Sequence, residues 1–472
     1  MTLERFVRNL PRLSRSSWTA WIPVLPVGLY GLLLSLPRQW RMETTGFDLG
    51  IFEQAVRGYA AGQLPVATLK GTGFDVLGDH FSPALALLAP FYRLFPSAQT
   101  LLVAQAVLFA LSVPPVTGVA VELLGRARGV AVGSAYGLSW GVWRAELFDF
   151  HEVALAVPLV ALAVAALVRG RHRAAVCWAL PLLLVKEDQG LLVAGVGALV
   201  WWRGGRRLGA VAVLAAVAGT LLAVLVVVPA FNPDGHYDYG ASAAWHGDPL
   251  ARLLLPAVKW HTVALLLAPT LFVALRSPVC LLLVLPLAAR FWTPNPTYWG
   301  CGQHYNAVLM PVLFLSLADG LARLPRRTGR LARWVPALAL LLALDAAPVP
   351  DLAAPGDGVR AARHALAAIP DGATVAAANQ LAPQLTGRCT VSLFPYLTYP
   401  DARGPLRRPV ARWVAAVDRP GDFPVPEREQ RAAQAALPAA GYRVAAVGGG
   451  VTVYEWTGGP GPGRAAGVIG DR

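Results

Sequence analysis

The sequence predicts an α-helical polytopic membrane protein with about eleven spans and a small C-terminal α/β domain. Three observations lead to this fold class. Hydrophobic residues make up 56% of the 472 residues and charged residues only 14%, whereas roughly a quarter of the residues of a soluble globular protein are charged. Apolar runs recur at lengths that span a bilayer. Arginine-rich short loops alternate with loops rich in His, Asp, Tyr and Trp, a pattern that fixes orientation in a membrane.

The first predicted span covers Trp18 to Leu36. Arg5, Arg8, Arg12 and Arg15 precede it and place the N-terminus in the cytoplasm. Because the run lacks a small-residue cleavage site, we expect a retained span and not a cleaved signal peptide. The net charge of +14 does not indicate nucleic-acid binding, since the arginines gather in short loops between apolar runs.

A large first outer loop is predicted at residues 37–96. Its stretch FSPALALLAPFYRLF is short for a span and has proline at both ends, so we expect a surface helix. The remaining apolar runs continue to residue 349 and are joined by turns such as GRARG, RGRHR and RGGRR, which we place inside the cell. Residues 1–349 therefore form the predicted multi-span domain.

The tail changes composition after about residue 350 and becomes rich in polar residues, Pro and Gly. Its patterns predict helices at GVRAARHALAAIP, QLAPQLTG and PEREQRAAQAALPAAG, and strands at ATVAAAN, VARWVAAVD, YRVAAV and GVTVYEW. Alternating elements favour an α/β domain at residues 350–456, which the span count places outside the cytoplasm. Residues 457–472 are predicted to be a disordered tail.

The stretch TTGFDLGIFEQAVRGYA in the first outer loop contains one residue out of pattern. If residues 47–59 form an amphipathic surface helix, the carboxylate of Asp48 shares its apolar face with Phe52. Glu53 and Arg57 stand four residues apart on the other face, where we expect a solvated ion pair.

Asp48 fits two interpretations. It can form a loose capping box with Thr45 at the start of the helix, where acids are favourable. Alternatively, its apolar neighbours dock on lipid while its carboxylate faces a cavity at the outer edge of the membrane. A carboxylate there can accept a proton from a hydroxyl group or hold a divalent cation, the candidate cofactor. The four cysteines show no metal-ligand spacing, and the metal question stays open.

Four further polar stretches on the predicted outer side interrupt the apolar pattern: GDHFSP, WRAELFDFHE, LLLVKEDQGLLVA and GCGQHYNAVLMP. They are consistent with turns, a hairpin tip and an interfacial tyrosine. Ionisable groups near a bilayer are costly unless they line a wet cavity, which favours a functional interpretation. The candidate substrate-binding residues are His80, Asp149, His151, Glu152, Lys186, Glu187, His304 and Tyr305.

Several motifs together carry a family resemblance: FDLGIFEQAV, GDHFSP, FDFHE, LLVKEDQGL, QHYNAVLMP and IPDGATVAAANQLAPQLTGR. They resemble the bacterial membrane family called domain of unknown function 2079 over about residues 40–400. The layout is also similar to the GT-C glycosyltransferases, multi-span enzymes whose large first outer loop bears a catalytic acid. This resemblance implies a polyprenyl-phosphate sugar donor, with Asp48 as the first-loop acid. A single Asp follows Phe47, where better-known members carry paired acids.

We therefore expect a GT-C-type membrane glycosyltransferase at the outer face of the bacterial plasma membrane, acting on an extracytoplasmic acceptor. Asp48 is the expected base, and Lys186, His80 and His304 are the expected ligands of the lipid phosphate. The expected partners are membrane lipids and the sugar donor, not nucleic acid, and the oligomeric state is open. The alternatives are a transporter or flippase, because intramembrane charges also mark transport paths, and a non-catalytic cell-envelope protein. The two halves of the chain show no internal repeat, which disfavours transport.

Overall fold

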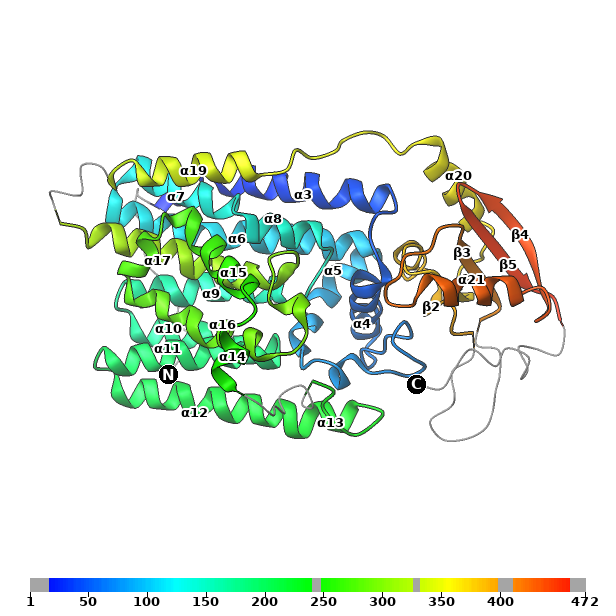
Figure 1. The fold of residues 1–472 in the computed structure, drawn as a ribbon, viewed down its shortest axis with the longest axis horizontal. Coiled ribbons are helices and arrows are strands. Elements are labelled where there is room, and N and C mark those ends of the chain that lie inside the picture. The colour runs from blue at the N-terminus through cyan, green and yellow to red at the C-terminus, as the bar shows by residue number, and fades with distance from the viewer. Residues whose placement is uncertain (1–16, 240–247, 326–331, 398–410, 459–472) are drawn as a thin grey trace.

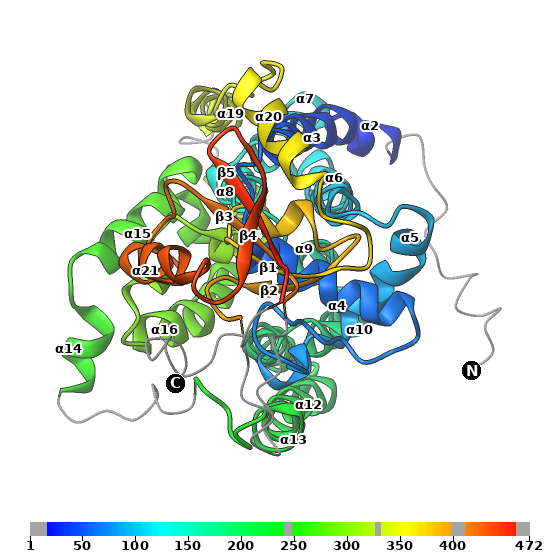
Figure 2. The same ribbon diagram turned by 90° about the vertical axis from the view of Figure 1, so that its right-hand side faces the viewer.

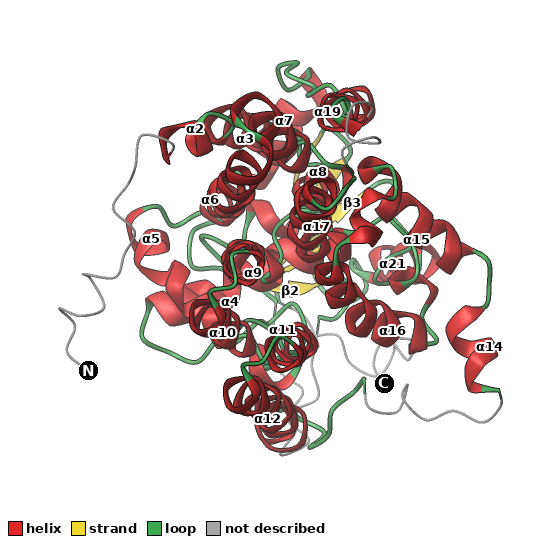
Figure 3. Ribbon diagram, turned by 90° about the vertical axis from the view of Figure 1, so that its left-hand side faces the viewer, coloured by secondary structure: helices red, strands yellow, loops and turns green. Residues whose placement is uncertain are grey.

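The computed structural model describes residues 17–239, 248–325, 332–397 and 411–458. Most helices lie along the long axis of the molecule, and the strands form a separate unit at one end (Figure 1). Viewed from the end opposite the sheet, many of the helices are seen nearly end-on (Figure 3). The architecture is therefore a helical bundle with a small sheet domain beyond one end.

Within the described residues, four helical segments are long and apolar enough to cross a membrane: Trp18–Trp40, Ala98–Leu124, Arg206–Phe231 and His304–Ala322. Shorter apolar helices accompany them at Pro83–Leu94, Val153–Val168, His172–Leu184, Pro278–Trp292 and Val335–Ala346. The membrane class is thus supported by length and composition, while the count of about eleven spans stays a prediction.

The α-helices of the bundle are α2 Ser17–Trp21, α3 Val24–Trp40, α4 Ile51–Ala60, α5 Ala89–Leu94, α6 Ala98–Leu124, α7 Arg126–Gly137, α8 Trp140–Leu147, α9 Val153–Val168, α10 His172–Ala179, α11 Gly190–Trp202, α12 Arg206–Leu222, α13 Val228–Phe231, α14 Pro249–Leu254, α15 Val258–Leu267, α16 Val284–Trp292, α17 Met310–Ala322 and α19 Val335–Ala346. The 3₁₀ turns η3 Pro83–Leu88, η5 Glu187–Gln189 and η12 His304–Leu309 precede α5, α11 and α17.

The helices differ in how far they are buried. In the most apolar part of His304–Ala322, 83% of the residues are buried, against 22% for Arg206–Phe231. The first segment is therefore central in the bundle. The second presents large apolar side chains outward, as a lipid-facing helix does; these include Val211, Leu214, Val217, Leu221, Leu222 and Leu225.

The sheet domain contains α20 (Asp357–Leu366), η13 (Ala382–Gln384), α21 (Glu427–Ala436) and five described strands. The strands are β1 Thr374–Ala377, β2 Thr390–Leu393, β3 Trp413–Val417, β4 Tyr442–Gly448 and β5 Val451–Trp456. Their order is β2-β1-β3-β5-β4. β1 pairs in parallel with β2 and β3, whereas β5 pairs antiparallel with β3 and β4. In Figure 2 this sheet lies across the end of the bundle.

The predicted helices and strands of the tail are confirmed, and one strand was missed. That strand is β2, which lies at an edge of the sheet and pairs with β1 from Thr374↔Thr390 to Ala377↔Leu393. The domain limits at 350 and 456 stay a prediction. From residue 459 onward, the predicted disordered tail lies outside the described residues.

The predicted surface helix at FSPALALLAPFYRLF consists of two short pieces, η3 and α5. Leu87, Phe91 and Leu94 are exposed on it, while Leu85 and Tyr92 are buried. The segment is too short to span a bilayer, in agreement with the sequence-based expectation.

The predicted helix at residues 47–59 consists of α4, Ile51–Ala60, and the π-helical turn Gly46–Gly50 before it, in which Phe47 has non-helical dihedrals. After Phe47 this turn runs into α4, so Asp48 stands about one helical turn before Phe52. The neighbouring side chains are not on lipid: Leu49 and Phe52 belong to the core of the bundle, and Ile51 belongs to that of the sheet domain. The lipid-docking part of the Asp48 interpretation is wrong.

The predicted solvated ion pair between Glu53 and Arg57 is also wrong. Glu53 is fully buried and accepts hydrogen bonds from the Tyr92 hydroxyl, at 3.0 Å, and from the Thr386 hydroxyl. Arg57 donates to the carbonyl oxygens of Thr386 and Cys389. The polar face of α4 is thus covered by the sheet domain, which ties that domain to the bundle.

Candidate functional site

A cavity of about 750 Å³ is lined by residues of both the helical bundle and the sheet domain. Eight of the nine residues predicted from the sequence line it: Asp48, His80, Asp149, His151, Glu152, Lys186, His304 and Tyr305. The ninth, Glu187, lies directly behind His80. The polar stretches that are scattered through the sequence therefore meet in one place.

Asp48 opens onto this cavity. Its side chain is 30% exposed, and its Oδ2 atom lies 3.5 Å from Nε2 of the buried His151. A carboxylate that is partly open to a cavity and faces an imidazole can accept a proton from a bound hydroxyl group.

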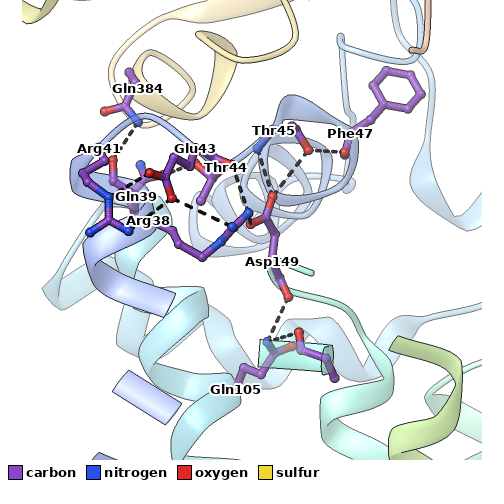
Figure 4. A network of polar contacts seen from close by, with 11 residues as sticks. Arg38, Gln39, Arg41, Glu43, Thr44, Thr45, Phe47, Gln105, Asp149 and Gln384 are labelled. Carbon is purple, nitrogen blue, oxygen red and sulfur yellow. Dashed lines mark hydrogen bonds and ion pairs between the residues drawn. The ribbon is translucent and has the colours of Figure 1, made fainter. Parts of the chain in front are cut away.

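The turn that carries Asp48 is held on one side by Asp149 (Figure 4). Oδ2 of Asp149 accepts a hydrogen bond from the backbone N–H of Thr45 at 2.9 Å. The Thr45 hydroxyl donates to the carbonyl oxygen of Phe47. Since the Thr45 side chain is engaged with Phe47 and its N–H with Asp149, the predicted capping box with Asp48 is wrong.

On the other side the same turn is held by the sheet domain. Oδ1 of Asn379 accepts from the backbone N–H of Phe47 at 2.9 Å, and the Asn379 carbonyl accepts from the N–H of Gly46 at 2.7 Å. A Cβ atom at Gly46 would lie 2.7 Å from Cβ of Ala382, so this close approach requires glycine. The position of Asp48 thus depends on contacts with both parts of the protein.

Asp149 is itself fixed by the bundle. The side chain of Gln105 donates to the carbonyl oxygen of Asp149 at 2.8 Å and accepts from the N–H of His151 at 3.2 Å. Asp149 has a left-handed backbone conformation, with φ of 72°. Burial raises the pKa of Asp149 to about 6, although the N–H of Thr45 and the guanidinium of Arg38 act against the rise.

His80 is positioned by Glu187. The ring Nδ1 of His80 lies 2.8 Å from Oε1 of Glu187, and Oε2 of Glu187 accepts from the N–H of Phe81 at 2.9 Å. Burial alone would raise the pKa of Glu187, but the charges of His80 and Lys186 outweigh it and lower this pKa to about 2. Glu187 therefore orients His80 from behind and does not line the cavity.

Two lysines reach the cavity, each paired with an acid. Nζ of Lys186 lies 2.6 Å from Oε1 of the buried Glu152, and Nζ of Lys70 lies 2.5 Å from Oδ2 of Asp79. The Asp79 carboxylate also accepts from the Tyr239 hydroxyl at 3.2 Å. These pairs place two ammonium groups in the cavity wall, where they can meet an anionic group of a ligand.

A family model described as "Predicted membrane protein (DUF2079)" matches residues 38–453. The chain belongs to this family. The matched range of this DUF2079 protein runs from Arg38, the first residue that lines the cavity, to beyond Phe423, the last. The resemblance drawn from the motifs is therefore confirmed, as is the membrane class. No curated protein sequence matches the chain significantly.

The candidate divalent cation does not fit the residues around Asp48. In the described part of the DUF2079 chain, no group of three or more His, Cys, Asp or Glu side chains is arranged to hold a metal ion. The rings of His151 and His304 stack instead of converging on a point.

The structure adds cavity residues outside the set of candidates chosen from the sequence: Arg38, Lys70, Asp79, Tyr239, Tyr298, Asn379, Asp422 and Phe423. Two of them carried a usable signal. Lys70 is one of only three lysines in the chain, and Asp79 stands beside His80 in GDHFSP. Asn379 and Phe423 carried none, because they approach the site only through tertiary packing.

Proposed function

We propose that this DUF2079 protein is a GT-C-type membrane glycosyltransferase that moves a sugar from a polyprenyl-phosphate donor to an extracytoplasmic acceptor. One observation carries the proposal. The partly exposed carboxylate of Asp48 shares a cavity with two ammonium groups, those of Lys70 and Lys186, at the end of an apolar bundle. Such a site combines a base for a hydroxyl group with charges for a phosphate.

The proposed reaction is a direct displacement with inversion. Asp48 accepts the proton of the acceptor hydroxyl as its oxygen attacks the anomeric carbon of the sugar. The bond between that carbon and the phosphate oxygen breaks, and polyprenyl phosphate leaves with the bonding electrons. Lys186 and Lys70, with His80 beside them, stabilise the charge that develops on the leaving phosphate.

The expected orientation in the membrane follows from the arginine-rich loops of the sequence. The cavity and the sheet domain face the outside of the bacterial plasma membrane, and the N-terminus is cytoplasmic. Exposed apolar side chains along the bundle provide the surface on which the polyprenyl chain lies beside membrane lipids.

The test compares Asp48→Asn with Asp345→Asn, a matched change at an exposed position in the last turn of α19. Both proteins are reconstituted in vesicles with radiolabelled polyprenyl-phosphate hexoses and an extract of cell-envelope acceptors. We expect Asp48→Asn to lose transfer by about 10²-fold or more, the size of general-base catalysis, and Asp345→Asn to match wild type. Full transfer by folded Asp48→Asn would contradict the assigned role.

A further inference from the structure

Two histidines beside Asp48 form a stacked pair. The rings of His151 and His304 have centroids 3.4 Å apart and planes inclined by 23°. They come from the loop before α9 and from the start of η12, and both line the cavity. The exposed fractions of the two residues are only 6% and 2%.

Three ring nitrogens of the pair are unpaired within the described residues. Nδ1 of His151 and both ring nitrogens of His304 have no hydrogen-bond partner there. Buried polar atoms are normally satisfied, because an unpaired one costs the free energy of its lost hydration. Both residues line the same cavity as the candidate base, so a polar ligand that reaches the rings from the cavity would satisfy these atoms.

The surroundings disfavour a positive charge on the rings. Aromatic rings lie against them. The ring centroid of Phe148 is 5.4 Å from that of His151 and 5.1 Å from that of His304, and the ring centroid of Tyr305 is 4.3 Å from that of His304. Two positive rings at the stacking distance would repel each other. Burial lowers the pKa of His151 and outweighs the opposing charges of Asp48 and Glu152.

A neutral imidazole has one donor and one acceptor nitrogen, which matches a hydroxyl group, itself both donor and acceptor. A carboxylate offers acceptors alone and an ammonium group donors alone, so either would leave part of the pair unsatisfied. We propose that His151 and His304 bind hydroxyl groups of the transferred sugar and select an uncharged polyhydroxylated sugar over a uronate or an amino sugar. This inference rests on the proposed transfer reaction and names its substrate class.

The test measures hydroxyl discrimination. Wild type, His304→Phe and the control His364→Phe, at an exposed position of α20, are given polyprenyl-phosphate glucose, mannose and galactose. Each donor is compared with its monodeoxy analogues and its uronate. Transfer is measured as kcat/KM, donor binding by native mass spectrometry, and folding by thermal unfolding. His304→Phe keeps a flat ring for stacking but loses both nitrogens.

We expect wild type to prefer one neutral hexose over one of its monodeoxy analogues by roughly tenfold, the size of one buried hydrogen bond. His304→Phe should lose this preference, an effect that a merely structural role does not produce, and His364→Phe should keep it. If His304→Phe does not fold, His151→Phe is measured in its place.

Three results would overturn the inference. These are an unchanged deoxy preference in the folded variant, a wild-type preference for the uronate, and no binding of any donor. Selective binding of a neutral hexose that is never transferred would leave the hydroxyl assignment standing and overturn the transferase reaction instead.

Discussion

Glu53 provides the sharpest test of how the sheet domain is attached to the bundle. Its carboxyl group is fully buried on α4 and accepts hydrogen bonds from Tyr92 of the bundle and Thr386 of the sheet domain. Burial raises the pKa of Glu53 from 4.5 to about 7, because it outweighs those hydrogen bonds and the charge of Arg57. The change to test is Glu53→Gln, which keeps the size of the side chain and removes its titration.

The direction and the size of the change in stability with pH follow from the raised pKa of Glu53. A raised pKa means that the folded state binds more protons than the unfolded state, so stability falls as the pH rises from about 4.5 through about 7. Each pKa unit corresponds to about 1.4 kcal/mol. Between pH 5 and pH 8, the free energy of unfolding of wild type should therefore fall by about 2 to 3 kcal/mol relative to Glu53→Gln.

The assay is thermal unfolding in detergent at fixed scan rate, followed by tryptophan fluorescence at pH 5, 6.5 and 8. Other titrating groups cancel in the difference between the two proteins. The Tm of Glu53→Gln minus the Tm of wild type should rise by several degrees between pH 5 and pH 8. The control is Glu427→Gln, which should show no such trend; the side chain of Glu427 is 40% exposed and pairs with Arg431. A Tm difference between Glu53→Gln and wild type that stays constant with pH would refute the buried, proton-binding state of Glu53.

Three further changes test the site. Because the pKa of Asp149 is about 6, transfer should decline below that pH as its hydrogen bond to Thr45 weakens, and Asp149→Asn should shift or flatten this acid limb in a pH–rate profile. Asn379→Ala leaves the N–H of Phe47 unpaired and should speed hydrogen exchange in residues 45–50 by roughly tenfold, measured by mass spectrometry; unchanged exchange would show that the sheet domain does not hold the turn. Lys186→Met leaves the buried Glu152 without its ion-pair partner and should lower the free energy of unfolding by about 3 kcal/mol or more. The double variant with Glu152→Gln should recover much of the lost Tm, and no recovery would argue against the ion pair.

Local sequence patterns predicted the elements of the tail well. β3 is a continuous apolar stretch, β5 is rich in β-branched and aromatic residues, and α20 and α21 have helical composition. β2 was missed because its four residues carry too little pattern to stand out. Its place in the sheet is decided by pairing with β1.

Part of the site could be predicted from the sequence, and the reason is physical. Charged residues at the ends of apolar runs are costly unless they share a wet cavity, so the candidates from Asp48 to His304 meet in one cavity. The contacts that hold Asp48 could not be predicted, because Asn379 lies 332 residues from Phe47 in sequence. The burial of Glu53 could not be predicted either, because its polar helical face is covered by Thr386, which is distant in sequence.

The most direct test of the transferase account is native mass spectrometry of the gently solubilised protein, wild type beside Asp48→Asn. If Asp48 activates the acceptor, the variant should retain an intact polyprenyl-phosphate hexose, and wild type should carry more of the spent polyprenyl phosphate. Bulk phospholipid alone on both proteins, with added polyprenyl-phosphate hexoses also failing to bind, would contradict the account.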